Sequence, residues 1–111
     1  MVQPKGLPAL LRPMMATLGA LPPQSQDQLW AYEVKWDGVR AVAYIEGGRL
    51  RLMSRSDKDI TVRYPELAPL GAALNGPVVL DGEIVDLDSD AQLSFSRLQH
   101  RMHSTGTCGL R

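Results

Sequence analysis

A hairpin pattern in the middle of the chain constrains the fold more than any other feature. Val39, Ala41, Ala43 and Ile45 alternate with the side chains between them, and Gly47-Gly48 follows at the spacing of a two-residue β-turn. Leu50 and Leu52 continue the alternation up to Ser54. Because a period of two places alternate side chains on one face of a strand, we expect two antiparallel strands here.

Weaker patterns flank this hairpin. In the run 29–34, Trp30, Tyr32 and Val34 share one face of an extended chain, which predicts a strand ending at Lys35. The leucine spacing over 61–74 predicts a helix with Thr61 as a candidate cap. Pro69 lies inside it, so a break, or a start after Pro65, is the alternative. Short strands are expected at 78–80 and 84–87, around Asp81-Gly82-Glu83, and a short helix at 95–102.

These elements predict an α+β fold with antiparallel hairpins and short flanking helices. Residues 1–28 are rich in proline and glycine, so we expect an irregular N-terminal arm there. Residues 29–102 would form the folded portion, and 103–111 an unpatterned tail.

The charge of the chain bears on DNA binding, and its cysteine content bears on the cellular compartment. The 111 residues carry 12 basic and 12 acidic side chains, whereas a domain that grips DNA alone usually has a basic excess. One local cluster is basic, and it is either a solvated strand face or a phosphate-facing patch: Arg49, Arg51, Arg55, Lys58 and Arg63. The single cysteine favours a reducing compartment. We expect no signal peptide, no membrane span and no zinc site.

The segment Lys35-Trp36-Asp37-Gly38-Val39-Arg40 carries the chemistry. It places an amine at a strand end beside a carboxylate and a guanidinium, where a neutral amine could attack phosphorus. At the ordinary lysine pKa near 10.4, only about one amine in 2,500 is neutral at pH 7, and a downward shift of about three units would raise that to roughly a third. The alternative is a surface lysine in an ordinary salt bridge.

Three segments in order resemble a known family. Glu33–Arg40 resembles the nucleotidyl-transfer motif of ATP-dependent DNA ligases, Ser54–Asp57 the second ligase motif, and Leu80–Val85 the third. The flanking segments 13–16 and 95–101 are most similar to the ligase domain of bacterial non-homologous end-joining ligases. The resemblance implies a partial nucleotidyltransferase (ATP-grasp-like) domain that uses ATP and Mg²⁺ and forms a lysyl-AMP intermediate for sealing nicked or broken duplex DNA.

The resemblance also assigns candidate roles. Lys35 would be the catalytic nucleophile, and the nucleotide would be bound by Glu33, Arg40, Arg55 and Glu83. Glu83 is also the candidate magnesium ligand. Structural support would come from Asp37, Gly38 and Asp81, of which Gly38 would serve a turn and Asp81 would hold another. For each arginine the alternative is a cross-strand salt bridge. Asp57 stands where the family usually has glycine, a departure that bears on the local turn.

Several expectations concern the whole protein. Later family motifs, including two lysines, and the C-terminal OB-fold have no counterpart here, so we expect an incomplete ligase that does not seal DNA alone. A natural fragment, a truncated gene product and a frame-shifted end after Met102 are the alternatives. Further domains of a repair ligase would be its partners, in a bacterial cytoplasm at the nucleoid. The rivals are an RNA ligase or capping-type transferase, and a catalytically inactive binding or regulatory fragment.

Overall fold

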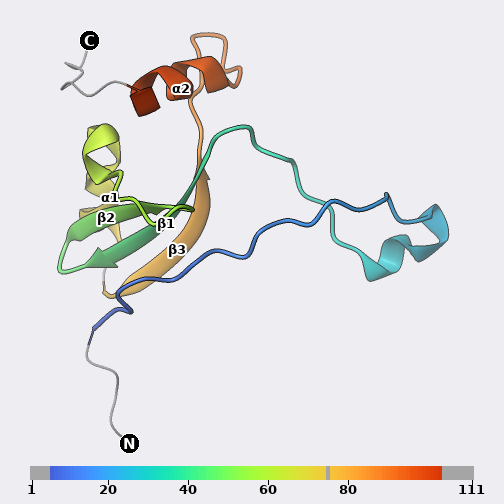
Figure 1. Ribbon diagram of the computed structural model, residues 1–111, viewed down its shortest axis with the longest axis horizontal. Coiled ribbons are helices and arrows are strands. Elements are labelled where there is room, and N and C mark those ends of the chain that lie inside the picture. The colour runs from blue at the N-terminus through green and yellow to red at the C-terminus, as the bar shows by residue number, and fades with distance from the viewer. Residues whose placement is uncertain (1–5, 75, 104–111) are drawn as a thin grey trace, which may run out of the picture.

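A three-stranded antiparallel sheet forms the centre of the molecule (Figure 1). The computed structural model describes residues 6–74 and 76–103. Along the chain the elements are η1 (Gln24–Leu29), β1 (Val39–Glu46), β2 (Arg49–Ser54), η2 (Thr61–Arg63), η3 (Pro65–Leu67), α1 (Pro69–Ala73), β3 (Val78–Ile84) and α2 (Phe95–His103). The strand order is β2-β1-β3. The predicted α+β class, with hairpins and short helices, is confirmed.

The predicted hairpin is present at the predicted residues. β1 and β2 pair from Glu46↔Arg49 at the turn to Ala41↔Ser54 at the open end. Gly47 and Gly48 both have positive φ, +59° and +76°, which the favoured two-residue hairpin turn requires at both of its central positions. The local sequence was therefore sufficient to fix both the turn and the register.

The prediction of two short strands around Asp81-Gly82-Glu83 is wrong. A single strand, β3, runs through these residues and pairs with β1 from Val78↔Ile45 to Ile84↔Val39. Asp81, Gly82 and Glu83 are all exposed in the structure, because β3 lies at the edge of the described sheet. Polar side chains are tolerated on an edge strand, so they did not mark a turn.

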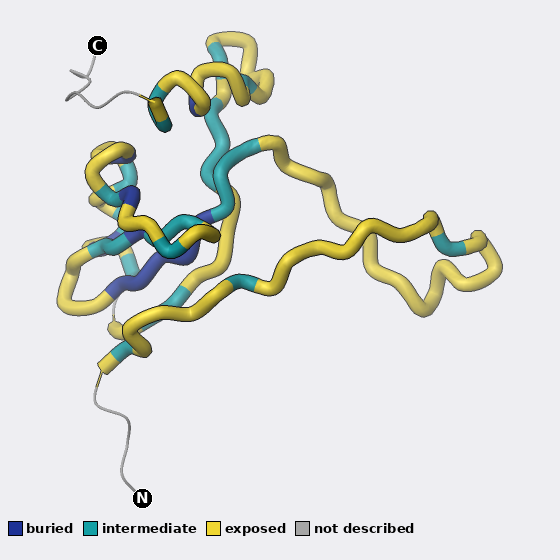
Figure 2. The backbone as a smooth tube through the Cα atoms, in the orientation of Figure 1, coloured by how far each residue is buried: buried dark blue, intermediate teal, exposed yellow. Residues whose placement is uncertain are grey.

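The prediction of a strand over 29–34 is also wrong. Residues 30–37 are extended but pair with no strand of the described chain, and Trp30, Tyr32 and Val34 are all more than half exposed. Their alternation therefore has no buried face. Within the predicted irregular arm, Gln24–Leu29 forms the 3₁₀ helix η1. Figure 2 shows this part of the chain running out from the sheet and back, exposed along most of its length.

The region predicted as a helix over 61–74 is broken. It forms two 3₁₀ turns, η2 and η3, and then α1, which starts at Pro69. Pro65 and Pro69 each stand at the start of their element, because a proline has no N–H to donate inside a helix. Thr61 does not act as the expected cap. Its hydroxyl accepts a hydrogen bond from the Leu52 N–H at 2.9 Å and so ties η2 to β2.

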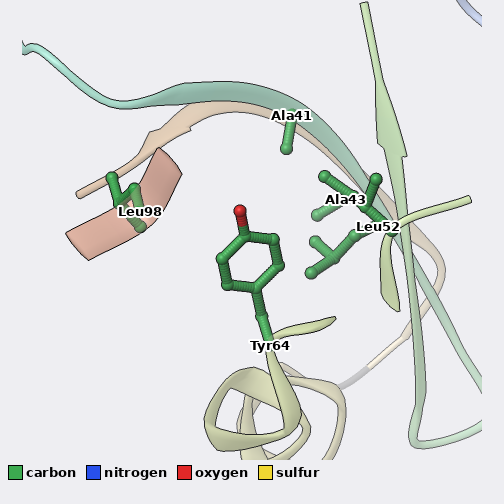
Figure 3. Packing of buried hydrophobic residues seen from close by; sticks show 6 residues of the cluster. Ala41, Ala43, Leu52, Tyr64 and Leu98 are labelled. Atoms are coloured by element: carbon green, nitrogen blue, oxygen red, sulfur yellow. The ribbon is translucent and has the colours of Figure 1, made fainter. Parts of the chain in front are cut away.

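The hydrophobic core lies on one face of the sheet. Two residues from outside the sheet pack against this face: Tyr64, which lies between η2 and η3, and Leu98 of α2. They face Ala41, Ala43 and Leu52 of the sheet (Figure 3). Leu98 is 1% exposed and is the buried residue of α2, whose bounds match the predicted helix to within one residue. The core therefore connects α2 to the sheet.

The beginning of the arm covers part of the opposite face. The Tyr44 hydroxyl accepts a hydrogen bond from the Leu11 N–H, and Arg51 Nη2 donates to the Ala9 carbonyl at 2.9 Å. Arg12 forms an ion pair with Asp57, 2.9 Å from Nη2 to Oδ2. These contacts fix the first part of the arm to the sheet before the chain runs outward.

Candidate active site

A cavity of about 360 Å³ lies where the extended segment 30–37 enters β1. Four of the predicted catalytic and nucleotide-binding residues line it, Lys35, Arg40, Arg55 and Glu83, together with two of the predicted supporting residues, Asp37 and Gly38. The first four come from the end of that segment, from β1, from the loop after β2 and from β3. A second hollow of about 630 Å³ shares Lys35, Arg40 and Glu83 and adds Glu33. The fold thus gathers the five predicted catalytic and nucleotide-binding residues around two adjoining hollows.

Lys35 reaches into solvent beside its own motif. Its side chain is 90% exposed, and Nζ lies 3.1 Å from Asp37 Oδ1. An exposed ion pair of this kind contributes little to stability, so the pair can open when a charged ligand arrives. The amine is therefore accessible, with one carboxylate beside it.

Gly38 permits the close approach between the beginning of β1 and the end of β3. A Cβ at this position would overlap the carbonyl oxygen of Ile84 and approach Val85 Cγ1 to 3.0 Å. The structure therefore excludes a side chain at position 38, as expected. The excluding group is the backbone of the neighbouring strand β3 and not a turn. This approach brings the segment that carries Lys35 next to Glu83.

Arg40 is held by a cross-strand ion pair. Its Nε and Nη2 atoms donate to the two carboxylate oxygens of Asp81 at 2.8 and 2.7 Å. The hydrogen bond from Arg40 lowers the Asp81 pKa, and the same bond, with additional attraction from Glu83, raises the pKa of Arg40. The prediction that Asp81 holds a turn is therefore wrong, because Asp81 lies within β3 and orients Arg40 instead.

Arg55 and Glu83 have more freedom to bind a ligand. Glu83 is the direct cross-strand partner of Arg40 and is exposed at the edge of the sheet. Arg55 is exposed in the loop after β2, and no carboxylate in residues 6–74 and 76–103 pairs with it. A guanidinium without a carboxylate partner is suited to bind a phosphate group.

The loop after β2 forms a tight turn although Asp57 stands where the family usually has glycine. Its φ is +61°, in the left-handed region that aspartate tolerates better than most residues. The Asp57 N–H donates to the Ser54 carbonyl at 3.1 Å, and its carboxylate pairs with Arg12. The departure from glycine therefore leaves the loop that carries Arg55 in a tight turn.

Two wall residues were missed by the sequence analysis. Phe95 and Met102 of α2 line the cavity beside Lys35. Phe95, Leu98 and Met102 are spaced at three and four residues, a helical spacing that could have indicated a shared face. Arg101 anchors the same helix through an ion pair with Glu66, and its guanidinium lies 5.0 Å from the centre of the Tyr64 ring.

The described residues provide few ligands for a metal. They contain no group of three or more His, Cys, Asp or Glu side chains that could hold an ion. Glu83 and Asp37 are the carboxylates of the cavity wall. Such a wall fits a magnesium ion bound mainly by phosphate oxygens and water, with one protein carboxylate. In the same residues, no helix is long and apolar enough to cross a membrane.

Comparison with known proteins identifies relatives of this chain. Residues 13–108 match the family model of the ATP dependent DNA ligase domain. The chain is 46% identical over 96 residues to the multifunctional non-homologous end joining DNA repair protein LigD of Mycobacterium tuberculosis, covering 86% of this chain and 12% of that protein. DNA ligase C of the same organism is 39% identical over 93 residues, covering 82% of this chain and 24% of the relative.

Solved structures show the same relationship. A mycobacterial DNA ligase D complexed with ATP and MES aligns with a TM-score of 0.57 and 46% identity, over 62% of this chain and 23% of that one. The ligase domain of M. tuberculosis LigD aligns with a TM-score of 0.56 and 42% identity, over 68% and 25%. The chain thus spans about an eighth of the LigD proteins and about a quarter of the solved ligase chains. The chain belongs to the ATP-dependent DNA ligase domain family.

Proposed function

We propose that this chain provides the nucleophile and part of the ATP pocket for DNA ligation. The observation that carries the proposal is the convergence of Lys35, Arg40, Arg55 and Glu83 on one cavity. Three separate segments contribute these residues, and each of them resembles a ligase motif. Chance exposure of a lysine would not explain why the other charged groups gather around it.

The proposed step is adenylyl transfer to Lys35. The neutral amine attacks the α-phosphorus of ATP, a nitrogen–phosphorus bond forms, the bond to the bridging oxygen breaks, and pyrophosphate leaves. The amine loses a proton, and Asp37, 3.1 Å from Nζ, is positioned to accept it.

The other cavity residues would hold the nucleotide. Arg55 offers a charge for a phosphate, and the Glu83 carboxylate can accept hydrogen bonds from ribose hydroxyls or hold a magnesium ion. Glu33 lines the adjoining hollow that also contains Lys35. Phe95 and Met102 add apolar surface against which a base can stack. Magnesium would enter with the triphosphate and neutralise part of its charge.

The proposal extends to duplex DNA as the final substrate. The net charge of zero gives the chain little general attraction to DNA, so DNA binding would depend on further ligase domains. We place the protein at the nucleoid of the bacterial cytoplasm, in the repair of nicks or breaks. The 90% exposure of the Lys35 side chain favours one rival, an inactive binding fragment, because the amine lies in open solvent and not in a closed pocket.

Labelled ATP separates these alternatives. The chain is tested alone and as a chimera, in which it replaces the matched segment of the M. tuberculosis LigD ligase domain. With Mg²⁺, the chimera should retain label from the α-phosphate of ATP after denaturation and none from the γ-phosphate. The chain alone should retain only a trace. A folded chimera that retains no α-label would support the inactive fragment and refute the proposal.

A further inference from the structure

The N-terminal arm reaches the loop that carries Arg55. Arg12 of the arm donates to Asp57 Oδ2 from both Nε and Nη2, at 3.1 and 2.9 Å. The two residues lie 45 positions apart in the sequence, so this contact depends on the arm lying against the sheet. Asp57 follows closely after Arg55, whose side chain lines the cavity beside Lys35. An ion pair therefore joins the arm to the candidate active site.

A closed turn fixes the backbone that carries Arg55. The Ser54 N–H donates to the Lys58 carbonyl at 2.8 Å, and the Asp57 N–H donates to the Ser54 carbonyl at 3.1 Å. The Ser54 hydroxyl accepts further hydrogen bonds from the Ser56 and Lys58 N–H groups at 3.3 and 3.2 Å. Since no carboxylate in residues 6–74 and 76–103 pairs with Arg55, the placement of its guanidinium depends on this turn.

Asp57 is the strained position of the turn. Its φ of +61° lies in the left-handed region, which is unfavourable for every residue except glycine, although less so for aspartate than for most. Its carboxylate is also the acidic group nearest to Arg55 in the sequence, and a carboxylate left unpaired there would compete with a phosphate for the Arg55 guanidinium. Arg12 binds that carboxylate, which stabilises Asp57 in this conformation and keeps it from Arg55.

The exposure of the ion pair limits it to a local effect. The Arg12 side chain is 77% exposed and the Asp57 side chain 31%, and exposed pairs contribute little to the stability of a whole fold. The usual contribution of such a pair corresponds to roughly a two- to fivefold change in a local equilibrium. A change of this size does not unfold the sheet, but it alters how often the turn holds Arg55 in place.

We propose that Arg12 is a positioning residue for Arg55. Its ion pair with Asp57 holds the turn closed and occupies the Asp57 carboxylate, so the Arg55 guanidinium stays open to a phosphate of the nucleotide. Contact of the N-terminal arm with the sheet is thereby coupled to nucleotide binding. The effect on nucleotide binding rests on the proposed function, whereas the effect on the turn does not.

Amide hydrogen exchange in the full chain tests the effect on the turn. Exchange of the Ser54 amide, which closes the turn, should become about two- to fivefold faster in Arg12→Ala. In an Asp57→Gly background Arg12→Ala should have no effect on this amide, because glycine adopts a positive φ without a partner. Arg49→Ala is the matched control, since Arg49 is an exposed arginine at the opposite end of β2. It should leave Ser54 exchange unchanged, and the Tm of Arg12→Ala should stay close to that of the unchanged chain.

The ATP dependence of adenylylation in the LigD chimera tests the coupling. Arg12→Ala should raise the ATP concentration needed for half the maximal rate by about two- to fivefold and leave the maximal rate nearly unchanged, because a contact to bound ATP is weakened. Arg55→Ala should raise this concentration further, and Arg12→Ala should add nothing in that background. Asp57→Gly should restore the ATP dependence of Arg12→Ala.

The two readouts separate the turn from the chemistry. The positioning role of Arg12 would be overturned by unchanged Ser54 exchange in Arg12→Ala, by an equal change in Arg49→Ala, or by an undiminished effect in the Asp57→Gly background. An ATP effect of Arg12→Ala that persists in the Arg55→Ala background would overturn it as well. If the exchange results are as expected but the chimera takes up no label, or Arg55→Ala leaves the ATP dependence unchanged, the turn is as described and the proposed function fails.

Discussion

Replacing Tyr64 with phenylalanine should stabilise the fold. Tyr64 is 2% exposed, and its hydroxyl is buried without a hydrogen-bond partner in the described structure. In Figure 3 this hydroxyl points into the apolar space between Ala41 and Leu98. Burial raises the Tyr64 pKa, as expected for a phenol removed from water. Phe keeps the ring and its contact with the Arg101 guanidinium, and removes only the oxygen.

The expected gain follows from the cost of an unpaired polar group. Burying a hydroxyl without a partner costs about 1–3 kcal/mol, and the substitution removes this cost at the expense of a small void. We therefore expect the free energy of unfolding to rise by about 1 kcal/mol. For a folded unit of this size, that corresponds to an increase in Tm of roughly 4–8 °C.

Urea unfolding of the chain, followed by circular dichroism, measures this change. Tyr44→Phe is the matched control, because Tyr44 is equally buried but its hydroxyl accepts a hydrogen bond from the Leu11 N–H. That control should lose about 1 kcal/mol. If Tyr64→Phe destabilises the chain as much as Tyr44→Phe does, the hydroxyl has a partner and the reasoning fails.

Three further predictions use the same chain or the chimera. Gly38→Ala should destabilise the fold by about 1–3 kcal/mol and reduce adenylylation, because the new methyl overlaps the Ile84 carbonyl; unchanged melting would contradict this. Glu83→Ala should slow adenylylation of the chimera roughly ten- to hundredfold. Glu83→Gln should be milder if the partner is ribose and equally severe if it is magnesium, and unchanged rates in both would make Glu83 structural. The hydrogen bond from Arg101 lowers the Glu66 pKa below its ordinary 4.5. The Glu66–Arg101 pair therefore contributes its full stabilisation above pH 4.5, and this contribution is lost as the pH falls through the lowered pKa. In Glu66→Gln, the free energy of unfolding should fall less steeply than in the unchanged chain as the pH is lowered through this range.

The local parts of the fold could be predicted from the sequence. The hairpin depends on a period of two and on Gly47-Gly48, both of which are short-range signals. The strand predicted over 29–34 failed because alternation creates a strand only where another strand accepts its hydrogen bonds. The sequence predicted two short strands in place of β3, because the pairing of β3 with β1 joins residues about 40 positions apart and no local pattern shows such a pairing.

The site was predictable to a similar degree. The motif order identified Lys35, Arg40, Arg55 and Glu83, and the structure places all four on one cavity. Their individual roles remain predictions. The helical spacing of Phe95 and Met102 could have indicated a shared face, but its position beside the cavity depends on how Leu98 packs α2 against the sheet. The pairing of Arg40 with Asp81 likewise required the register of β1 and β3.

Peptide mapping of the adenylylated protein tests the central claim most directly. The chain contains three lysines, Lys5, Lys35 and Lys58, so the position of an adduct can be assigned without ambiguity. After incubation of the chimera with ATP and Mg²⁺, the mass of one AMP should appear on the peptide that contains Lys35, and Lys35→Ala should abolish it. An AMP adduct on Lys58 or on a lysine of the LigD portion, or an undiminished adduct in Lys35→Ala, would contradict the account.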